Sequence, residues 1–413
     1  MSSISWLDYS EHDRRRMLDV IQLFKEKDTR DELGTGSIRD GLADLLFPGV
    51  STIQTRARYF FIVPWIYLDL ERKRSRKGQP SGASYSAANR GRAAEIAVIK
   101  ALIDSAETEG VIGQRAKEKL QRLPSSVYWQ GLRVLGIRSY PGAQDQYHRL
   151  LDRGGELTIE TSRDDDGLVV ERRRSNWHAG LPPAPAEFPK ALTLALTRPE
   201  ALYLQERIVS QTAGSLFAFL AAHGKPVERL DFPWEHPQRA EFGPRIQEQL
   251  RHAQNFSEAI HGAALLYNLL LSEASRHREL IDLYRDRLAA WEAALSVRRA
   301  ELAAWDLNAF WATVRQGNPR IPSFTKTFVD LWLHLALPSS SRTTNLGKNA
   351  DARDLVANRE AFLKRDLARL KNQRNLDLWL AAGIDAGAGT GRIDFRWGNA
   401  QTHLADIFAG LDL

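Results

Sequence analysis

The sequence predicts a mainly α-helical, multi-helical protein, with a helix-turn-helix or winged-helix-like N-terminal part and an all-helical C-terminal part. Apolar residues recur at helical spacing through most of the chain. Residues 110–140 have the pattern of two helices separated by a tight break that contains a proline. Two short runs of β-forming residues around one Asp-Gly turn predict a single small β-hairpin in the N-terminal part.

Composition limits the classes of structure and function that fit the chain. Its 413 residues are expected to form two or three domains, and 43% hydrophobic residues is ordinary for a globular protein. The absence of cysteine excludes disulfides, thiolate catalysis and cysteine-ligated metal sites. No apolar run reaches about 18 residues and the start lacks an apolar signal core, so we expect a cytoplasmic protein without a membrane partner. The net charge of +6 rests mostly on arginine, which suits contacts to phosphate and guanine.

Three helices are expected in the first 70 residues. Helical spacing and capping patterns predict a helix over 10–27, a second that begins at Ser37, and a third, largely buried, that begins at Ser51. Residues 72–92 are basic, rich in glycine and serine and without apolar periodicity, so we expect an exposed linker. Such a segment can hold phosphate without sequence preference or can simply be solvated, and the sequence leaves both open.

The stretch around Pro124 is the expected DNA-reading unit. A helix over 91–108 precedes it, and residues 114–122 are strong helix formers. Pro124 ends that first helix, and a second helix is expected to run from there to Gly136. The expected groove-facing residues of this second helix are Ser126, Tyr128, Gln130 and Arg133. The alternative is an ordinary helical hairpin in which Tyr128 and its neighbouring tryptophan are core aromatics.

A further helix over 143–152 and a β-hairpin complete the expected N-terminal domain. The strands are expected at 157–161 and 168–171, around an acidic turn at 164–167. Three helices followed by a hairpin is the order of a winged helix, although the helix at 143–152 intrudes in it. Three aspartates at the hairpin tip would repel phosphate. If the unit reads DNA, the helix after Pro124 must therefore do so with little help from the wing.

The Pro-rich segment 176–190 marks the strongest expected domain boundary. After it, helices are expected over 198–222, 245–316 (two or three), 322–337, 351–382 and 399–410, with one short strand at 393–397. The expected domains are a helical region 1–70, a basic linker 71–92, a winged-helix-like domain 93–180 and a helical domain 190–413.

Three local patterns are too weak to predict a site. Glu258 and His261 have a metal-binding spacing, but the second Glu-x-x-His pair and the extra carboxylates of a di-iron site are not evident. An arginine followed by a histidine after six residues, as in one family of helical ribonucleases, occurs at a frequency expected by chance (Arg245 to His252, Arg396 to His403). The glycine-rich residues 383–391 are followed by arginine, so they do not match a phosphate loop. We therefore expect neither a metal site nor a cofactor.

Four segments together resemble a bacterial family of unknown function: RARYFFIVPWIY, RLPSSVYWQGLRVLGI, SRTTNLGKNADARDL and DFRWGNAQTHLADI. The similarity covers essentially the whole chain. The resemblance implies relatives that are encoded in anti-phage defence clusters beside helicases, methyltransferases and large ATPases. It therefore implies an accessory subunit that works with DNA or with those enzymes. The family has no assigned catalytic residues, so the resemblance implies none in this chain.

The sequence thus favours a non-catalytic DNA-binding or scaffolding subunit of a bacterial anti-phage defence system. Its expected partners are the phosphate backbone of double-stranded DNA, other defence proteins such as a helicase or an ATPase, and possible further copies of the chain. Two alternatives stay open: a protein-interaction adaptor without DNA contact, and a nuclease or hydrolase with a dispersed active site. The expected nucleic-acid contacts are Arg72, Lys73, Arg74, Arg76, Lys77, Ser126, Tyr128, Gln130, Arg133, Arg138, Arg342, Thr344, Asn345 and Lys348.

Overall fold

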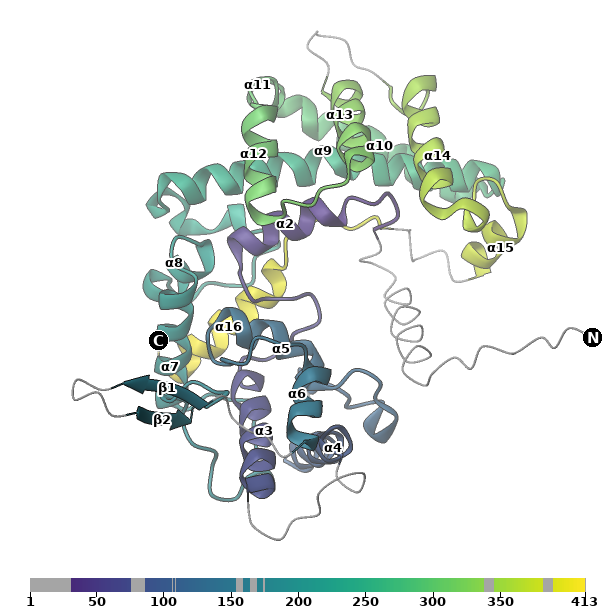
Figure 1. The fold of residues 1–413 in the computed structure, drawn as a ribbon. Helices are drawn as coiled ribbons and strands as arrows, with labels where there is room; N and C mark the ends of the chain where they lie inside the picture. The colour runs from purple at the N-terminus through teal and green to yellow at the C-terminus, as the bar shows by residue number, and fades with distance from the viewer. Residues whose placement is uncertain are drawn as a thin grey trace, which may run out of the picture. The chain divides into compact units, whose positions relative to one another are not determined.

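The computed structural model describes residues 31–75, 86–105, 107, 109–153, 159–163, 169–173, 175–337, 345–381 and 389–412, and this part of the chain is mainly α-helical (Figure 1). The chain forms two compact units, and each combines two separate stretches of sequence. Unit 1 holds the described residues of Met1–Ala43 and Gln247–Phe395. Unit 2 holds those of Asp44–Ile246 and Arg396–Leu413. The division differs from the serial one that the Pro-rich segment suggested, because the last helix packs against residues from the middle of the chain.

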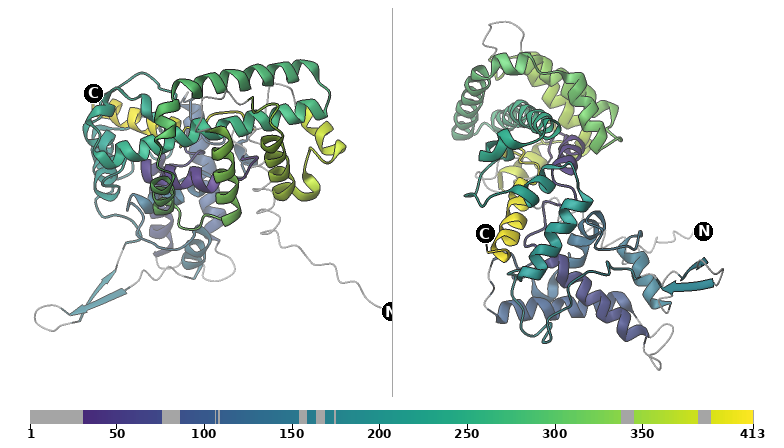
Figure 2. Two further views of the ribbon diagram at one scale, coloured as in Figure 1. Left: turned by 90° about the horizontal axis from the view of Figure 1, so that it is seen from above. Right: turned by 90° about the vertical axis from the view of Figure 1, so that its left-hand side faces the viewer.

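Figure 2 shows the same elements from two further directions. The elements of unit 2 are α3 (Tyr59–Ser75), α4 (Ala87–Asp104), α5 (Pro124–Val134), α6 (Gln144–Asp152), β1 (Ile159–Arg163), β2 (Val169–Arg173), α7 (Arg198–Gln211), α8 (Leu216–His223) and α16 (Trp397–Gly410), with 3₁₀ helices at Lys117–Lys119, Pro233–Glu235 and Pro237–Glu241. Those of unit 1 are α10 (Arg278–Val297), α11 (Arg299–Ala303), α12 (Leu307–Gly317), α13 (Ser323–Ala336), α14 (Ala350–Lys364), a 3₁₀ helix at Arg365–Leu367 and α15 (Gln373–Ala381). Both α2 (Gly36–Leu46) and α9 (Pro244–Ala274) contain a unit boundary.

Helix α3 is the apolar centre of unit 2. Its residues 59–63 are at most 1% exposed, as expected for so apolar a stretch. The expected helix start at Ser51 is wrong, because backbone groups before α3 are bonded to other elements. The Thr55 amide donates to the Tyr128 hydroxyl (2.8 Å), and this hydroxyl donates to the Arg56 carbonyl oxygen (2.9 Å). Tyr128 on α5 therefore fixes the chain just ahead of α3.

The expected linker 71–92 is largely helical where the structure describes it. Helix α3 continues to Ser75, and α4 begins directly after Ser86. The Ser86 hydroxyl accepts a hydrogen bond from the Asn89 amide (3.2 Å), which is an ordinary N-terminal cap. Residues 76–85, which hold most of the glycine and serine of this segment, lie outside the described residues.

A buried carboxylate joins α4 to the start of α5. The Glu95 carboxylate accepts hydrogen bonds from the Ser125 amide (2.8 Å) and the Ser125 hydroxyl (2.6 Å). Gln144 on α6 donates to the same hydroxyl (2.6 Å) and to the Tyr67 hydroxyl (2.8 Å). Glu95 is 1% exposed, and burial raises its pKa to about 7 although the Ser125 bonds oppose the shift. The network thus fixes α3, α4, α5 and α6 together through polar groups.

The prediction that residues 114–122 form the first helix of a helix-turn-helix is wrong. Residues 114–122 form turns and a short 3₁₀ helix, and Lys117 has the left-handed φ of 47° that an α-helix excludes. Tertiary contacts replace helical bonds here, because the Arg92 guanidinium on α4 donates to the carbonyl oxygens of Glu118 (2.7 Å) and Leu120 (2.9 Å). Strong helical propensity is therefore overridden, and α5 follows a loop.

The two strands of unit 2 lie within two residues of their expected positions. They pair antiparallel, with Ile159 opposite Arg173 and Arg163 opposite Val169. Residues 164–168, between the strands, lie outside the described residues. The hairpin turn and the winged-helix order therefore stay predictions.

Two expectations in the second half of the chain are wrong because of left-handed residues. The expected helix over 198–222 is interrupted at Gly214, whose φ is 82°, and so forms α7 and α8. The expected strand at 393–397 is absent, since Phe395 and Arg396 have φ values of 55° and 68° and lead directly into α16. This turn is the point at which the chain returns from unit 1 to unit 2.

The expected single helix over 351–382 is also wrong. Arg365 has a φ of 48°, which ends α14. Glu360 is completely buried, and its carboxylate accepts hydrogen bonds from the Arg369 amide (2.9 Å) and the Leu370 amide (3.1 Å). These amides would bond to carbonyl oxygens four residues earlier in a continuous helix. The buried carboxylate takes them instead, so the chain turns before α15.

Long helices α9 and α10 form the framework of unit 1 and lie side by side (Figures 1 and 2). Residues 265–271 of α9 are at most 9% exposed, so this apolar run is buried on all sides of the helix. The Trp291 indole of α10 donates to the Glu258 carbonyl oxygen (2.7 Å), and the Trp332 indole of α13 donates to that of Ala259 (2.8 Å). No helix in the described ranges is long and apolar enough to cross a membrane.

The raised pKa of Glu95 predicts a specific dependence of stability on pH. A carboxyl with a folded pKa of about 7 and an unfolded pKa of 4.5 contributes stability below pH 4.5 that is lost as pH rises through 7. The loss is on the order of 3 kcal/mol, since one pKa unit corresponds to about 1.4 kcal/mol. Urea unfolding of the wild type and of Glu95→Gln between pH 4.5 and 8 should therefore show a falling free energy that the variant lacks. The exposed control Glu228→Gln should keep the wild-type slope, and parallel curves for wild type and Glu95→Gln would contradict the assignment.

Candidate functional site

The residues expected to contact DNA are divided between the two units. Asn345 and Lys348 belong to unit 1, and the other expected residues that the structure describes belong to unit 2. Both are exposed, and the Asn345 side chain accepts a hydrogen bond from the Lys348 amide (3.1 Å), as in an ordinary turn. The expected contacts that lie outside the described residues are Arg76, Lys77, Arg342 and Thr344.

Three of the expected contacts serve the fold of unit 2. Tyr128 is completely buried and Arg138 is 2% exposed, so the expectation that they contact DNA is wrong. Arg138 donates twice to the Trp129 carbonyl oxygen (3.2 and 3.1 Å) and stacks on the Trp129 ring at 4.3 Å. Burial lowers its pKa to about 10, which is still too high for it to be neutral near pH 7. Arg74 donates to two carbonyl oxygens at the end of α6 (3.1 and 3.2 Å).

The remaining expected residues of α5 lie on its exposed face. Ser126, Gln130 and Arg133 are exposed, and their spacing of four and then three residues places them on one side of the helix. Arg133 donates to the Ser139 carbonyl oxygen (3.1 Å) and retains other donors. At the end of α3, Arg72 and Lys73 are exposed, and Lys73 pairs with Asp69 (2.6 Å).

Four cations directly before α5 were missed because residues 114–122 were interpreted as a helix. Arg115, Lys117 and Lys119 are exposed, Arg122 is half-buried, and none forms an ion pair with a described residue. Glu118 is the only carboxylate between Arg115 and Arg133, and it pairs with Lys100 on α4 (2.9 Å). The run of closely spaced basic residues in this segment was the sequence pattern that could have identified them. These cations and the exposed residues of α5 together form the α5 basic surface, which consists of Arg115, Lys117, Lys119, Arg122, Ser126, Gln130 and Arg133.

The N-terminus of α5 is not open to phosphate. A helix N-terminus attracts anions through its free amides and its dipole. In this helix the Glu95 carboxylate already accepts the Ser125 amide and is buried beside it. Any phosphate contact by the α5 basic surface must therefore come from its side chains.

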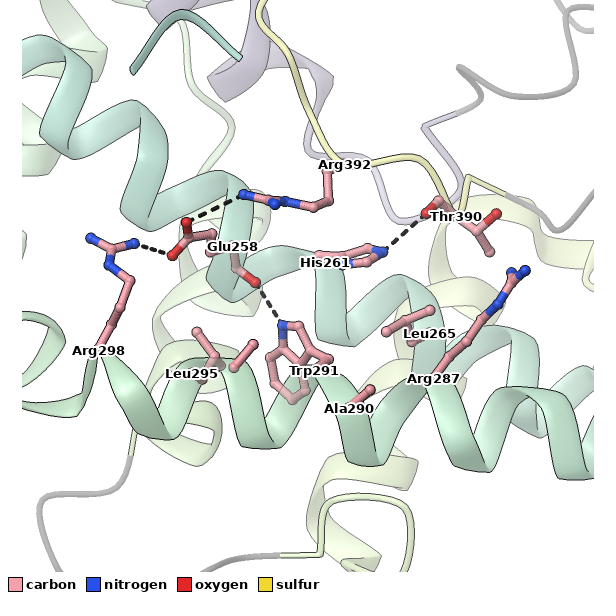
Figure 3. Close-up of a pocket in the computed structure, with 11 residues that line it drawn as sticks. Glu258, His261, Leu265, Arg287, Ala290, Trp291, Leu295, Arg298, Thr390 and Arg392 are labelled. Atoms are coloured by element: carbon pink, nitrogen blue, oxygen red, sulfur yellow. Dashed lines mark hydrogen bonds and ion pairs between the residues drawn. The ribbon is translucent and has the colours of Figure 1, made fainter. Parts of the chain in front are cut away.

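Unit 1 contains a cavity of about 640 Å³ between α9 and α10, called the α9–α10 cavity below (Figure 3). Its volume and its mixture of apolar walls with a few polar groups match those of small-molecule sites, which span roughly 300–1,000 Å³. The residues that line it are Glu258, His261 and Leu265 from α9, Arg287, Ala290, Trp291, Ala294, Leu295 and Arg298 along and just after α10, and Thr390 and Arg392 from the segment before α16. The residues on α10 repeat every three or four positions, which is the signal that could have identified this wall.

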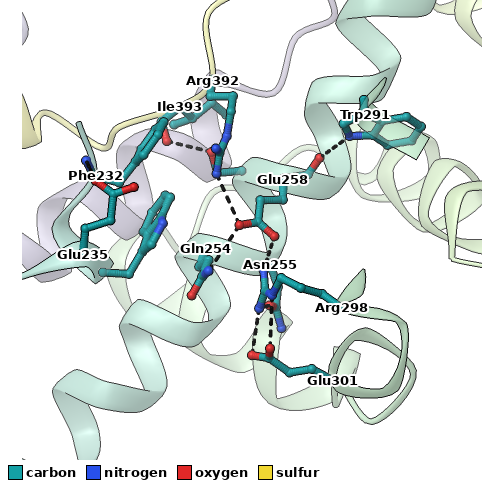
Figure 4. A network of polar contacts seen from close by, with 12 residues as sticks. Phe232, Glu235, Gln254, Asn255, Glu258, Trp291, Arg298, Glu301, Arg392 and Ile393 are labelled. Atoms are coloured by element: carbon teal, nitrogen blue, oxygen red, sulfur yellow. Dashed lines mark hydrogen bonds and ion pairs between the residues drawn. The ribbon is translucent and has the colours of Figure 1, made fainter. Parts of the chain in front are cut away.

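One carboxylate orders the charged end of this cavity (Figure 4). Glu258 accepts hydrogen bonds from Arg298, from Arg392 (3.2 Å) and from the side-chain amide of Gln254 (3.2 Å). Arg298 also pairs with Glu301 (2.7 Å), which lies outside the cavity lining. The guanidinium groups of Arg298 and Arg392 are therefore both held in place by Glu258, and Glu301 also holds that of Arg298.

The other polar groups of the cavity leave it positively charged. The His261 imidazole donates to the Thr390 carbonyl oxygen (3.0 Å), and burial, together with the nearby charges of Arg392 and Arg287, lowers its pKa. This histidine is therefore neutral near pH 7. Arg287 is exposed, stacks on Tyr284 at 5.6 Å and forms no ion pair with a described residue. Glu258 is thus the one carboxylate among three lining guanidinium groups.

Comparison with known protein families assigns the chain to a family. The model of one family, the family of unknown function DUF6361, matches residues 1–410. The chain belongs to this family. The expected resemblance to a family of unknown function is therefore confirmed over the whole chain, whereas its bacterial and defence setting stays a prediction. No curated protein and no solved structure matches the chain. For this DUF6361 member, residue roles must come from the geometry.

The metal and nuclease patterns in this family member lack the geometry of a site. Glu258 is occupied by three donors and His261 by Thr390, and the described ranges contain no group of three or more possible metal ligands. His252 is 1% exposed and accepts a hydrogen bond from the Trp305 indole (2.9 Å). His403 is completely buried in unit 2. Neither histidine of the two arginine–histidine patterns can reach a nucleic-acid backbone.

His403 predicts a stabilising substitution. Its ring lies against Phe60 (5.5 Å) and Tyr128 (6.4 Å), and neither ring nitrogen has a hydrogen-bond partner among the described residues. Because a buried polar group without a partner costs about 1–3 kcal/mol, His403→Phe should raise the free energy of unfolding by about 1 kcal/mol.

The same substitution should flatten the acid limb of the stability curve. Burial lowers the pKa of His403 from 6.5 to about 3, so stability that is present above pH 6.5 is lost as pH falls toward 3. Thermal unfolding between pH 4 and 7 measures this loss. His334→Phe, on an exposed position of α13, is the control and should keep the wild-type slope. Equal slopes for wild type and His403→Phe would show that His403 has a partner or water access.

Proposed function

We propose that the chain is a non-catalytic DNA-binding or scaffolding subunit of a bacterial anti-phage defence system, and that the α5 basic surface holds the phosphate backbone of duplex DNA. The observation that carries the proposal is the charge of this surface. Between Arg115 and Arg133 the segment has five cations and a single carboxylate, and that carboxylate is paired with Lys100. Exposed cations without local partners are the groups that displace condensed counterions from DNA.

The geometry favours contact with phosphate over base reading. Gln130 and Arg133 are the only exposed α5 residues with side chains suited to bidentate contact with purines. The loop cations Arg115, Lys117 and Lys119 form no ion pair with a residue that the structure describes, so they suit contacts that do not depend on sequence. The surface should therefore bind duplexes with little sequence preference, and Arg133 would supply most of what preference exists.

The defence setting and the other partners come from the resemblance described above. A helicase, a methyltransferase or a large ATPase would act on DNA that this subunit holds or positions. An adaptor that meets an acidic protein through the same cations is the competing proposal. Salt distinguishes the two proposals. DNA releases condensed counterions when it binds, so the logarithm of the affinity for DNA should fall steeply and linearly with the logarithm of the salt concentration, whereas the affinity for an acidic protein should not.

The test is fluorescence anisotropy of the full chain with a labelled duplex of about 25 base pairs, over about 50 to 300 mM salt, where phosphate contacts respond strongly. Neutralising Arg115, Lys117 and Lys119 to alanine should weaken binding at every sequence. A plot of the logarithm of the affinity against the logarithm of the salt concentration should also become less steep. Its slope should decrease in magnitude by up to about three, at roughly 0.9 per lost phosphate contact. Arg133→Ala should instead change the ratio of affinities between two unrelated duplexes.

The matched control removes three exposed cations elsewhere in unit 2, by changing Lys190, Arg198 and Arg229 to alanine. This variant loses the same net charge and should retain most of the affinity and most of the slope. Equal losses in the two triple variants would show that only net charge matters. If the wild type ignores DNA at about 50 mM salt, the proposal fails for the isolated chain. Product formation in the same mixtures with Mg²⁺ would overturn the non-catalytic assignment.

A further inference from the structure

We propose that the α9–α10 cavity is a binding site for a small organic anion that carries a carboxylate or phosphate headgroup on a flat or branched apolar body. The headgroup would pair with Arg287, and the body would lie against Trp291 and its apolar neighbours. This site is separate from the proposed DNA contact, because every residue that lines the cavity belongs to unit 1 and the α5 basic surface belongs to unit 2.

The apolar wall of the cavity is rigid. The Trp291 indole donates to the Glu258 carbonyl oxygen (2.7 Å) and packs near Trp332, with ring centroids 6.3 Å apart. A methyl group on Gly262 would lie 2.2 Å from the Trp291 ring, so the ring rests directly on the α9 backbone. Trp291, fixed in this way, lines the cavity together with Ala294. Figure 3 shows it beside Leu265 and Leu295. A preformed apolar wall lowers the entropic cost of binding a rigid apolar group.

The charged groups of the cavity differ in how firmly they are held. Arg298 and Arg392 share Glu258, so their charges are partly neutralised and their positions are set. Arg287 stacks on the face of Tyr284 at 5.6 Å and forms no ion pair with any residue that the structure describes. An exposed guanidinium at the rim of an apolar cavity can accept an anionic headgroup in bidentate geometry without giving up an ion pair.

Electrostatics selects an anion over a cation or a neutral molecule. The lining holds three guanidinium groups and one carboxylate, and His261 adds no negative charge. Burial is the main cause of the lowered pKa of His261, and the charges of Arg392 and Arg287 lower it further, so this histidine adds no positive charge either. An anion in the cavity could pair with Arg287 in a favourable potential. A cation could pair only with Glu258, whose carboxylate already binds two arginines.

The experiment uses two fluorescent probes that share an aromatic body and differ in charge. The anionic probe is 8-anilinonaphthalene-1-sulfonate, and the neutral one is N-phenyl-1-naphthylamine. The full chain should bind the anionic probe at one saturable site and more tightly than the neutral probe. Arg287→Ala should weaken the anionic probe about tenfold or more, since a charge-assisted hydrogen bond contributes roughly 1.5–3 kcal/mol. It should leave the affinity for the neutral probe unchanged.

Two further variants locate the site. Arg285→Ala removes an exposed arginine from the same helix that pairs with Glu273 (3.4 Å) outside the cavity lining, and it should leave both probes unaffected. Ala294→Phe adds a large side chain at an exposed position that lines the cavity, so it should fill the cavity and weaken both probes without lowering the thermal midpoint. Failure of Ala294→Phe to affect either probe in a folded protein would overturn the site.

Competition identifies the headgroup. Phenylacetate and phenyl phosphate carry the two candidate headgroups on the same flat apolar body, and displacement of the anionic probe by one of them assigns the class. Displacement by neither overturns the proposal. So does equal binding of the anionic probe to wild type and Arg287→Ala, or a loss in Arg285→Ala as large as in Arg287→Ala.

Discussion

The carboxylate of Asp406 holds unit 2 together across the whole length of the chain. It accepts hydrogen bonds from the Arg56 side chain (2.9 and 3.0 Å) and from the Ala57 amide (2.8 Å), which precede it by 350 and 349 residues. Asp406 is only 8% exposed, and removing one partner of such a buried pair typically costs about 3–5 kcal/mol. Because Tyr128 bonds to Arg56 as well, the same short stretch sets the positions of α3, α5 and α16. The orientation of the α5 basic surface therefore depends on a contact made by the last helix.

Sequence periodicity predicted the helices whose ends are set by local signals. The starts and ends of α5, α6 and α13 lie close to their expected positions, and Gly136 has the left-handed φ of 62° that was expected after α5. Periodicity failed where a side chain takes backbone groups that a helix would otherwise use. Arg92 does so at 114–122 and Glu360 after α14. Both partners lie more than two helical turns from the groups they bind, so helical propensity alone cannot indicate them.

The candidate sites follow the same rule. The exposure of Gln130 and Arg133 could be predicted because one helix carries both. The α9–α10 cavity could not, since Arg287 and Arg392 come from segments more than a hundred residues apart. The two sites also differ in physical character. The cations of the α5 basic surface lie in solvent, where salt screens them, whereas those of the cavity are partly ordered by Glu258 beside an apolar wall.

The order of synthesis gives the discontinuity of unit 2 a further consequence. All segments of unit 1 leave the ribosome before α16 does, so unit 1 can complete its core while unit 2 still lacks one helix. During that interval the Ala57 amide and the Arg56 guanidinium lack the Asp406 carboxylate as their partner. The apolar face of α7 that α16 covers is then exposed to water. A released chain that ends before residue 397 would lack α16, so its unit 2 would stay incomplete. Chaperones and proteases could bind that uncovered face until α16 packs against it.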